Sequence, residues 1–389
     1  MAKYKLGDIC EIVSGSTPKT GIEEFWDGNI KWITPAEINE DTYIINDSIR
    51  KITELAVKKT GLSPFPKGTV ILSSRAPIGK VAIAGCEMYC NQGFKNLICS
   101  DIICNKYLYW FLKGKTEYLN SLGRGATFKE LSKTIVSEIP IDVPSIDEQI
   151  KIAEILEKIN EIILMRKHEL EELDKLIKAR FVELFGNPRI NPNKYPTKMI
   201  KDTCIVITGN TPSRKVDEYY GDAIEWIKTD NIVSGLLYPT VASESLSDSG
   251  KAVGRTVDAG SILMACIAGS VASIGRVCIT DREVAFNQQI NAIVPKKYDV
   301  RFLHALLQIS KEYLVEDINM ALKGIMSKSK LEEKEFIVPS MEEQVGFAEF
   351  VEQVNKSLRK ESKVVQTKKQ YGDFSLTALS FASISIFSG

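Results

Sequence analysis

The heptapeptide Val143-Pro144-Ser145-Ile146-Asp147-Glu148-Gln149 returns 195 residues later as Val338-Pro339-Ser340-Met341-Glu342-Glu343-Gln344. In both copies a serine directly follows a proline and precedes a glutamate by three residues. This spacing is that of a capping box, in which the serine oxygen accepts a hydrogen bond from a backbone amide and the glutamate binds the amide of the serine. The pattern predicts that a helix begins at each copy.

Both predicted helices are long and carry one apolar stripe. Apolar residues recur at three- and four-residue steps over 152–184, until Gly186 and Pro188 stop the pattern. At 1.5 Å per residue, a helix of about 38 residues is roughly 57 Å long. A similar stripe covers 345–365 and ends near Gly372. Because each stripe needs a partner, we expect the two helices to form an antiparallel coiled coil. The alternative is that each helix folds back onto the globular part before it.

The rest of the chain is also duplicated, at an offset of 194 to 196 residues. The motifs Asp8, Gly15, Thr17-Pro18, Trp32-Ile33, Ile78-Gly79-Lys80-Val81 and Asn91-Gln92 return as Asp202, Gly209, Thr211-Pro212, Trp226-Ile227, Ile274-Gly275-Arg276-Val277 and Asn287-Gln288. An offset this constant indicates duplication of a whole domain and an internal pseudo-twofold repeat.

The duplication sets the expected domain boundaries. Globular parts are predicted over 1–145 and 187–340, the long helices over 146–186 and 341–372, and an apolar tail of unassigned role over 373–389. Short β-rich runs within the globular parts alternate with Gly, Pro and Asn turns. The fold class is therefore α/β or α+β twice over, with helical spacers.

An apolar helix is expected near the end of each globular part, over 106–119 and 300–316.

Charge is balanced overall, with 50 basic and 50 acidic residues, so a globally basic nucleic-acid coat is excluded. Residues 1–145 hold 18 Lys and Arg against 16 Asp and Glu, residues 187–340 hold 19 against 18, and residues 146–186 hold 7 against 10. Neither globular part alone is expected to hold DNA tightly. No apolar run is long enough to span a bilayer and the first residues lack a signal-peptide pattern, so we expect a cytoplasmic protein without membrane contact.

Eight cysteines and two histidines provide little material for a metal site. Cys86 with Cys90 and Cys99 with Cys104 each loosely resemble half of a zinc site, but no Cys-x2-Cys pair follows. Buried, reduced thiols are the preferred interpretation. His168 and His304 are interpreted as structural residues, and no metal or catalytic residue is predicted.

Polar and basic residues gather in the repeated loops, where they suit contacts to DNA bases and phosphates. Solvated loop positions are the alternative for each one. The predicted DNA-binding residues are Lys19, Ser73, Ser74, Arg75, Lys80, Asn91, Gln92, Arg124 and Lys129 in the first copy, and Arg214, Lys215, Ser270, Arg276, Asn287 and Gln288 in the second.

These motifs in this order resemble the specificity subunit of type I restriction–modification enzymes. The matching segments are Lys5-Leu-Gly-Asp8, Gly15-x-Thr17-Pro18, Trp32-Ile33, Ser73-Ser-Arg-Ala-Pro-Ile-Gly79, Asn91-Gln92, Val143 to Gln149 and Phe185-Gly-Asn-Pro188. The resemblance implies two target recognition domains that each read one half of a bipartite DNA site, held apart by the paired helices. The second copy has Ala265-Cys-Ile-Ala-Gly-Ser270 where the first has Ser73-Ser-Arg75, so a base contact by Arg75 does not transfer to it.

The resemblance also implies which chemistry lies on other chains. Two modification subunits would bring S-adenosylmethionine and methylate adenine, and restriction subunits would bring ATP and Mg-dependent cleavage. This chain is expected to be a non-catalytic subunit without a cofactor of its own. It has no Asn-Pro-Pro-Tyr/Phe motif and no Gly-x4-Gly-Lys-Ser/Thr phosphate loop. An enzyme with an unfamiliar site and a stand-alone bivalent DNA-binding regulator remain the alternatives.

Overall fold

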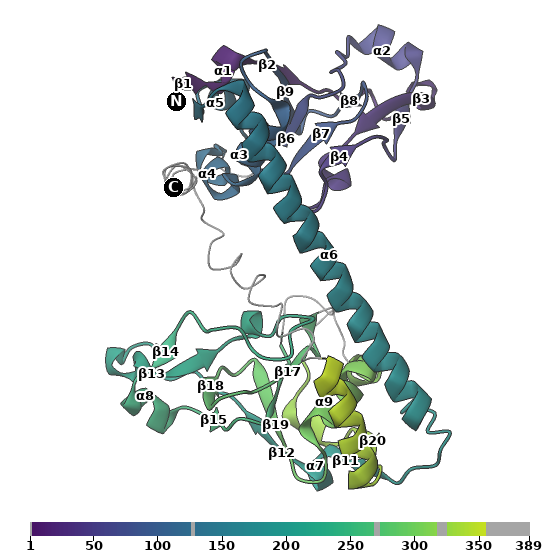
Figure 1. Cartoon of the computed structure of the whole chain (residues 1–389), viewed down its shortest axis with the longest axis vertical. Coiled ribbons are helices and arrows are strands. Elements are labelled where there is room, and N and C mark those ends of the chain that lie inside the picture. Colours follow the sequence, from purple (N-terminus) through teal and green to yellow (C-terminus); the bar gives the residue numbers. More distant parts are fainter. Residues whose placement is uncertain (1, 126–128, 268–272, 317–324, 355–389) are drawn as a thin grey trace. The chain divides into compact units, whose positions relative to one another are not determined.

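The computed structural model describes residues 2–125, 129–267, 273–316 and 325–354 (Figure 1). It contains two compact units, described here one at a time: unit 1 ends at Met165 and unit 2 begins at Arg166. Helix α6, Ile146–Phe185, passes through this division. The predicted spacer 146–186 is therefore shared, because its first part packs on the core of unit 1 and its last part on the core of unit 2.

A five-stranded sheet forms the centre of unit 1. Its strand order is β2 (Cys10–Ser14), β9 (Phe94–Cys99), β6 (Val70–Ser73), β7 (Val81–Ala84) and β4 (Ile44–Ile45), antiparallel except for the pair β7 and β4. Smaller sheets join β5 (Lys51–Ile52), β3 (Trp26–Ile33) and β8 (Tyr89–Cys90), and β1 (Ala2–Lys5) with β10 (Pro140–Val143). The helices are α1 (Leu6–Ile9), α2 (Glu54–Thr60), α3 (Asn105–Lys113), α4 (Thr116–Leu122) and α5 (Lys133–Ser137).

Unit 2 repeats this arrangement. Its central sheet has the order β12 (Cys204–Thr208), β19 (Ile290–Pro295), β16 (Ile262–Ala265) and β17 (Val277–Ile279). A second sheet joins β14 (Ser245–Leu246), β13 (Tyr220–Ile227), β18 (Val284–Phe286) and β15 (Thr256–Val257), and β11 (Thr197–Met199) pairs with β20 (Glu335–Ile337). The helices are α7 (Ile200–Thr203), α8 (Asp248–Val253), α9 (Val300–Ile309), α10 (Lys311–Val315) and α11 (Lys328–Glu332). The duplication and the α+β class predicted from the sequence are confirmed.

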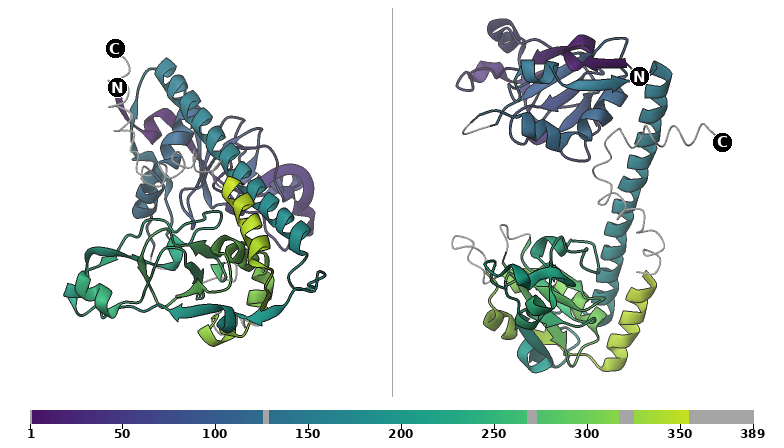
Figure 2. Two further views of the ribbon diagram at one scale, coloured as in Figure 1. Left: turned by 60° about the horizontal axis from the view of Figure 1, so that its bottom comes forward. Right: turned by 90° about the vertical axis from the view of Figure 1, so that its left-hand side faces the viewer.

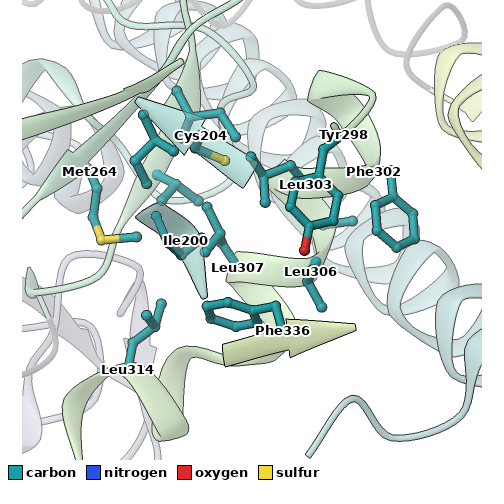
Figure 3. Packing of buried hydrophobic residues seen from close by; sticks show 14 of the residues in the cluster. Ile200, Cys204, Met264, Tyr298, Phe302, Leu303, Leu306, Leu307, Leu314 and Phe336 are labelled. Atoms are coloured by element: carbon teal, nitrogen blue, oxygen red, sulfur yellow. The ribbon is translucent and has the colours of Figure 1, made fainter. Parts of the chain in front are cut away.

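The central sheets are covered on both faces, which explains their continuous apolar strands. In β16, Ile262 and Met264 face one buried cluster, while Leu263 and Ala265 face another. Figure 3 shows the first cluster, where Met264 and Ile200 lie with side chains of α9 and with Phe336 of β20. The sheet therefore holds the loops at its ends on a rigid support.

Helix α6 begins and ends where its sequence predicts. The amide of Ser145 donates to Glu148 Oε2 at 3.1 Å, and the amide of Glu148 donates to Ser145 Oγ at 3.4 Å. At the other end Gly186 has a φ of +74°, a left-handed conformation that favours glycine and stops a helix. The 40 residues of α6 span roughly 60 Å.

A buried glutamine follows each capping box and ties the start of the helix to its unit. The side chain of Gln149 is fully buried; it accepts from the amide of Cys104 at 2.8 Å and donates to the carbonyls of Ile102 and Pro144, each at 3.0 Å. Gln344 is bound in the same way, to the amide of Asp299 at 2.9 Å and to the carbonyls of Lys297 and Pro339 at 3.4 Å and 2.9 Å.

The second long helix is described over residues 341–354, and it packs against the end of α6 within unit 2. Phe347 lies 5.4 Å from Phe181 and 5.8 Å from Phe185, measured between ring centroids. Figure 2 shows the two helices side by side and opposite in direction. Antiparallel pairing therefore holds for this part; the rest of the predicted helix, 355–372, and the tail 373–389 lie outside the described residues.

The two predicted apolar helices are each interrupted, which corrects the prediction of single helices over 106–119 and 300–316. Gly114 and Lys115 form a turn that separates α3 from α4. Ser310 separates α9 from α10. Glycine weakens a helix interior, and a serine side chain competes with the helix for backbone hydrogen bonds.

Among the described residues, no helix is long and apolar enough to cross a membrane. The eight cysteines are free thiols; Cys10, Cys90, Cys204, Cys266 and Cys278 are buried and the others half-buried.

Replacing Gln149 by leucine is expected to destabilise unit 1. The variant leaves the amide of Cys104 and two carbonyls without partners in a dry site, at a cost of about 3 kcal/mol in the free energy of unfolding. Urea unfolding measures this loss, and amide hydrogen exchange at Cys104 locates it. Gln92→Leu is the control, because that glutamine is exposed. Equal effects of the two substitutions would contradict the role of Gln149.

Burial of His304 is expected to make unit 2 less stable in acid. Burial lowers the pKa of this imidazole from 6.5 to about 4, and its Nε2 lies 3.4 Å from the carbonyl oxygen of Val277. Between these two pH values the unfolded chain binds a proton that the folded chain does not, so stability falls as the pH falls from 6.5 to about 4. We expect His304→Leu to remove up to about 3 kcal/mol of this pH dependence. Urea unfolding of both proteins at pH 7 and pH 4.5 gives the comparison, and an unchanged pH dependence would contradict it.

Candidate nucleic-acid interface

The predicted loops of unit 1 meet at one edge of its central sheet, which we call the loop edge. Strand β2 ends at Ser14 opposite Lys95, and β6 ends at Ser73 opposite Phe94. The amide of Asn91 donates to the carbonyl of Ile33 at 3.1 Å, which brings the end of β3 to the same place. The loops after β2, β3 and β6 and the loop before β9 therefore lie together.

Unit 2 has an equivalent loop edge. Thr208 at the end of β12 lies opposite Asn291, and Ala265 at the end of β16 lies opposite Ile290. The amide of Asn287 donates to the carbonyl of Ile227 at 3.0 Å, as the amide of Asn91 does in unit 1. The sequence repeat thus produces the same surface twice.

A glycine lets the loop after the first strand cross the Asn-Gln loop closely in both units. A Cβ atom on Gly15 would lie 2.1 Å from the carbonyl oxygen of Asn91, and one on Gly209 would lie 2.2 Å from that of Asn287. The crossing is fastened by a tryptophan, since Trp32 Nε1 donates to the carbonyl of Ser16 at 3.0 Å. Trp226 makes the corresponding bond to the carbonyl of Asn210 at 3.2 Å.

At this crossing each unit presents a hydrogen-bonded threonine and glutamine. The hydroxyl of Thr17 donates to Gln92 Oε1, and that of Thr211 donates to Gln288 Oε1. Both glutamines are exposed. Because the amide oxygen already accepts from threonine, the Nε2 group is the one suited to donate to an acceptor on a base edge.

The predicted residues Asn91 and Asn287 hold the loop in shape. Asn91 Oδ1 accepts from the amide of Gly93 at 2.9 Å, and Asn287 Oδ1 accepts from that of Gln289 at 3.1 Å. Asn91 is half-buried and Asn287 is buried. This turn chemistry is sufficient to explain an asparagine at both positions.

Ser73 and Ser74 are fully buried, so the structure does not support direct DNA contacts by these two residues. Ser73 Oγ donates to the carbonyl of Pro77 at 2.7 Å and accepts from the amide of Lys80 at 2.8 Å. Ser74 Oγ accepts from Lys95 Nζ at 3.4 Å. Both hydroxyls serve the loop itself.

Lys80 and Arg276 are half-buried and bind backbone carbonyls in the same way. Lys80 Nζ donates to the carbonyl of Pro35 at 2.9 Å, and Arg276 Nη2 donates to that of Thr229 at 3.2 Å. They tie two short helical turns to the loop edge, Pro35–Glu37 after β3 and Thr229–Asn231 after β13. These contacts therefore support a role for Lys80 and Arg276 in positioning the loop edge.

The remaining predicted cations are exposed. Arg75 Nε is 3.0 Å from Glu130 Oε2, and Arg214 lies 4.3 Å from the ring centroid of Tyr220 while also pairing with Glu244. The other exposed members are Lys19, Arg124, Lys129 and Lys215. Ser270 lies outside the described residues.

Several charged residues of these surfaces were missed by sequence reasoning. Glu130 also pairs with the buried Lys95 at 3.5 Å. The guanidinium of Arg50 lies 3.7 Å from the ring centroid of Trp26. In unit 2 hydrogen bonds from Lys228 and Arg214 hold the pKa of the Glu244 carboxyl below its usual range. The rings that these cations contact, Trp26 and Tyr220, are the first residues of β3 and β13 and stand at equivalent places in the repeat, 194 residues apart.

The described residues contain no cluster of three acidic, cysteine or histidine side chains that could hold a metal ion.

Comparisons with known proteins agree with the duplication of the chain. A family model described as a type I restriction modification DNA specificity domain matches residues 1–175 and 192–366. The type I restriction enzyme MjaIX specificity subunit of Methanocaldococcus jannaschii is 39% identical over 252 residues, which cover 60% of this chain and 58% of that relative. The MjaVIII specificity subunit of the same organism is 23% identical over 94% of this chain and 89% of its own length.

A solved structure shares the fold. The type I restriction–modification S subunit from M. genitalium superposes with a TM-score of 0.52 at 14% identity, over 96% of this chain and 94% of that chain.

Gly15→Ala is expected to displace the loop crossing in unit 1. The added Cβ meets a backbone oxygen, so the bond from Trp32 Nε1 to Ser16 should break and the indole N–H resonance should shift in a spectrum of protein labelled at tryptophan. Gly21→Ala is the matched control, since a Cβ there meets no atom within 4 Å. A Trp32 resonance that stays in place in Gly15→Ala would rule out the tight crossing.

Proposed function

We propose, for a chain that belongs to the type I restriction modification DNA specificity family, that each of its two units reads one half of a two-part DNA site. The observation that carries this proposal is the duplicated loop edge. In both units the same backbone framework presents an exposed glutamine, Gln92 or Gln288, held by a threonine. The side chains around it differ between the units, so the two half-sites should differ in sequence.

The charge distribution favours reading by two units together. Residues 1–145 have a net charge of +2, from 18 basic and 16 acidic residues. Residues 187–340 have a net charge of +1, from 19 basic and 18 acidic residues. Because acidic residues nearly cancel the basic ones in each part, each should bind DNA weakly and lose affinity with salt. Joined in one chain, the second unit binds at a high effective concentration, which makes the pair selective.

We propose that α6 spaces the two half-sites and serves as a docking surface for partner subunits. Large apolar side chains on the unit 1 part of α6 are exposed, including Ile155, Ile159, Ile162 and Met165 at 47% to 61%. Such a row suits a protein partner as well as the predicted helix over 355–372. The partners proposed are two modification subunits and the restriction subunits.

We assign the methylation and cleavage chemistry to those partner subunits. S-adenosylmethionine, ATP and Mg would bind to the modification and restriction subunits, and this chain would contribute recognition without catalysis. The polar groups of the loop edge suit this division, since glutamine, threonine and arginine read base edges by hydrogen bonding.

The test is to reconstitute the full chain with modification subunits and map methylated adenines by long-read sequencing. We expect a split motif with a constant gap. A continuous motif, or no methylation by an assembled complex, would contradict the proposal, and tight sequence-specific binding by the chain alone would favour a stand-alone regulator.

Matched glutamine variants assign the half-sites. Gln92→Ala should relax or weaken recognition of one half, and Gln288→Ala that of the other, each by about tenfold because a base contact is lost. If both variants affect the same half-site, the assignment of one unit to each half is wrong. Thermal unfolding of both variants controls for folding.

A further inference from the structure

The two loop edges differ in chemistry at one backbone bridge beside the central sheet. In unit 1 this bridge joins Arg75 to Glu130, and in unit 2 it joins Ile267 to Ile325. An ion pair in one unit therefore stands where two isoleucines stand in the other.

Backbone hydrogen bonds show that the two bridges are equivalent. The amide of Ser74 donates to the carbonyl of Gly93 at 2.7 Å, and that of Leu131 donates to the carbonyl of Ser74 at 2.9 Å. In unit 2 the amide of Cys266 donates to the carbonyl of Gln289 at 2.8 Å, and that of Met326 to the carbonyl of Cys266 at 2.9 Å. Each bridge therefore lies beside the loop that carries the exposed glutamine.

In unit 1 the bridge holds a guanidinium at the surface in a defined orientation. Arg75 is 45% exposed, and Glu130 binds it through Nε at 3.0 Å, the side of the guanidinium nearest the backbone. The opposite carboxylate oxygen of Glu130 lies 3.5 Å from Lys95 Nζ. Because this ion pair uses Nε, the two terminal nitrogens are the groups suited to donate to O6 and N7 of guanine.

In unit 2 the same place offers an apolar surface. Ile325 is 44% exposed and Ile267 is half-buried. The polar groups below them bond to each other, since Asn291 Nδ2 donates to Cys266 Sγ at 3.2 Å and Asn291 Oδ1 accepts from Thr208 Oγ1 at 2.8 Å. In the major groove, the apolar group that distinguishes one base pair is the methyl group of thymine.

We propose that these equivalent bridges set the type of base pair that each unit reads. Arg75 contacts the guanine of a G·C pair in the half-site of unit 1, with Glu130 as its positioning residue, and Ile325 with Ile267 contacts the methyl group of a thymine in the half-site of unit 2. This inference rests on the proposed function and adds the chemistry of one position in each half-site.

Base analogues test the proposal in the reconstituted complex, on a duplex that carries its mapped methylation motif. Replacing guanine by 7-deazaguanine in the half-site of unit 1 should reduce binding about tenfold for the wild-type chain and have no further effect for Arg75→Ala. Replacing thymine by uracil in the half-site of unit 2 should reduce binding roughly fourfold, the value of one buried methyl group, and have no further effect for Ile325→Ala.

The controls separate recognition from stability. When each analogue is placed in the other half-site, Arg75→Ala and Ile325→Ala should lose as much DNA affinity as the wild-type chain does. Glu130→Gln should lower discrimination at guanine while Arg75 is retained, a change that a purely structural ion pair would not produce. Ile325→Thr, which keeps a β-branched methyl group, should retain part of the uracil effect.

The outcomes distinguish this inference from the function on which it rests. No split motif means that the proposed function fails. A split motif whose first half lacks a G·C pair sensitive to Arg75→Ala, or whose second half is indifferent to uracil, overturns the assignment of the bridges and leaves the two-unit reading intact.

Discussion

The buried glutamine after each capping box is the interaction on which the rest of the structure depends. Gln149 and Gln344 each bind the loop before an apolar helix and the proline before the long helix. Leaving a buried amide group without hydrogen-bond partners costs a large free energy. These bonds therefore fix the starting point of each long helix relative to its own unit. Because this clamp was duplicated with the domain, both units carry the same framework and the same starting direction for a helix.

The loop edge separates groups that hold the surface from groups that can read a ligand. Glycine, tryptophan and asparagine hold the crossing through backbone contacts that recur in both units, as Gly15, Trp32 and Asn91 show in unit 1. The exposed glutamines are placed to contact a ligand in both units. The bridge residues also lie at the loop edge, and their chemistry differs between the two units. A constant framework with changeable positions is what a family needs if its members are to read different DNA sites.

Sequence alone was sufficient for the duplication, the two helix starts and the end of α6, because these depend on residues close together in the chain. The sequence alone did not predict which loop side chains are buried. Ser73 and Ser74 looked like loop residues available to DNA, yet the strand ladder next to β9 buries them. The partner of Arg75 lies 55 residues away at Glu130, a distance over which no local pattern gives a signal. The interruptions at Gly114 and Ser310 were missed because the apolar pattern continues across them.

The central claim is that each loop edge lies on its own half of one DNA site. The most direct measurement is site-specific photo-crosslinking from position 92 and, separately, from position 288 in the complex assembled on its target duplex. The account predicts that the crosslink from position 92 maps to one half-site and the crosslink from position 288 to the other, with the gap sequence untouched by both. Crosslinks from both positions to the same half-site, or crosslinks spread evenly along the duplex, would contradict it.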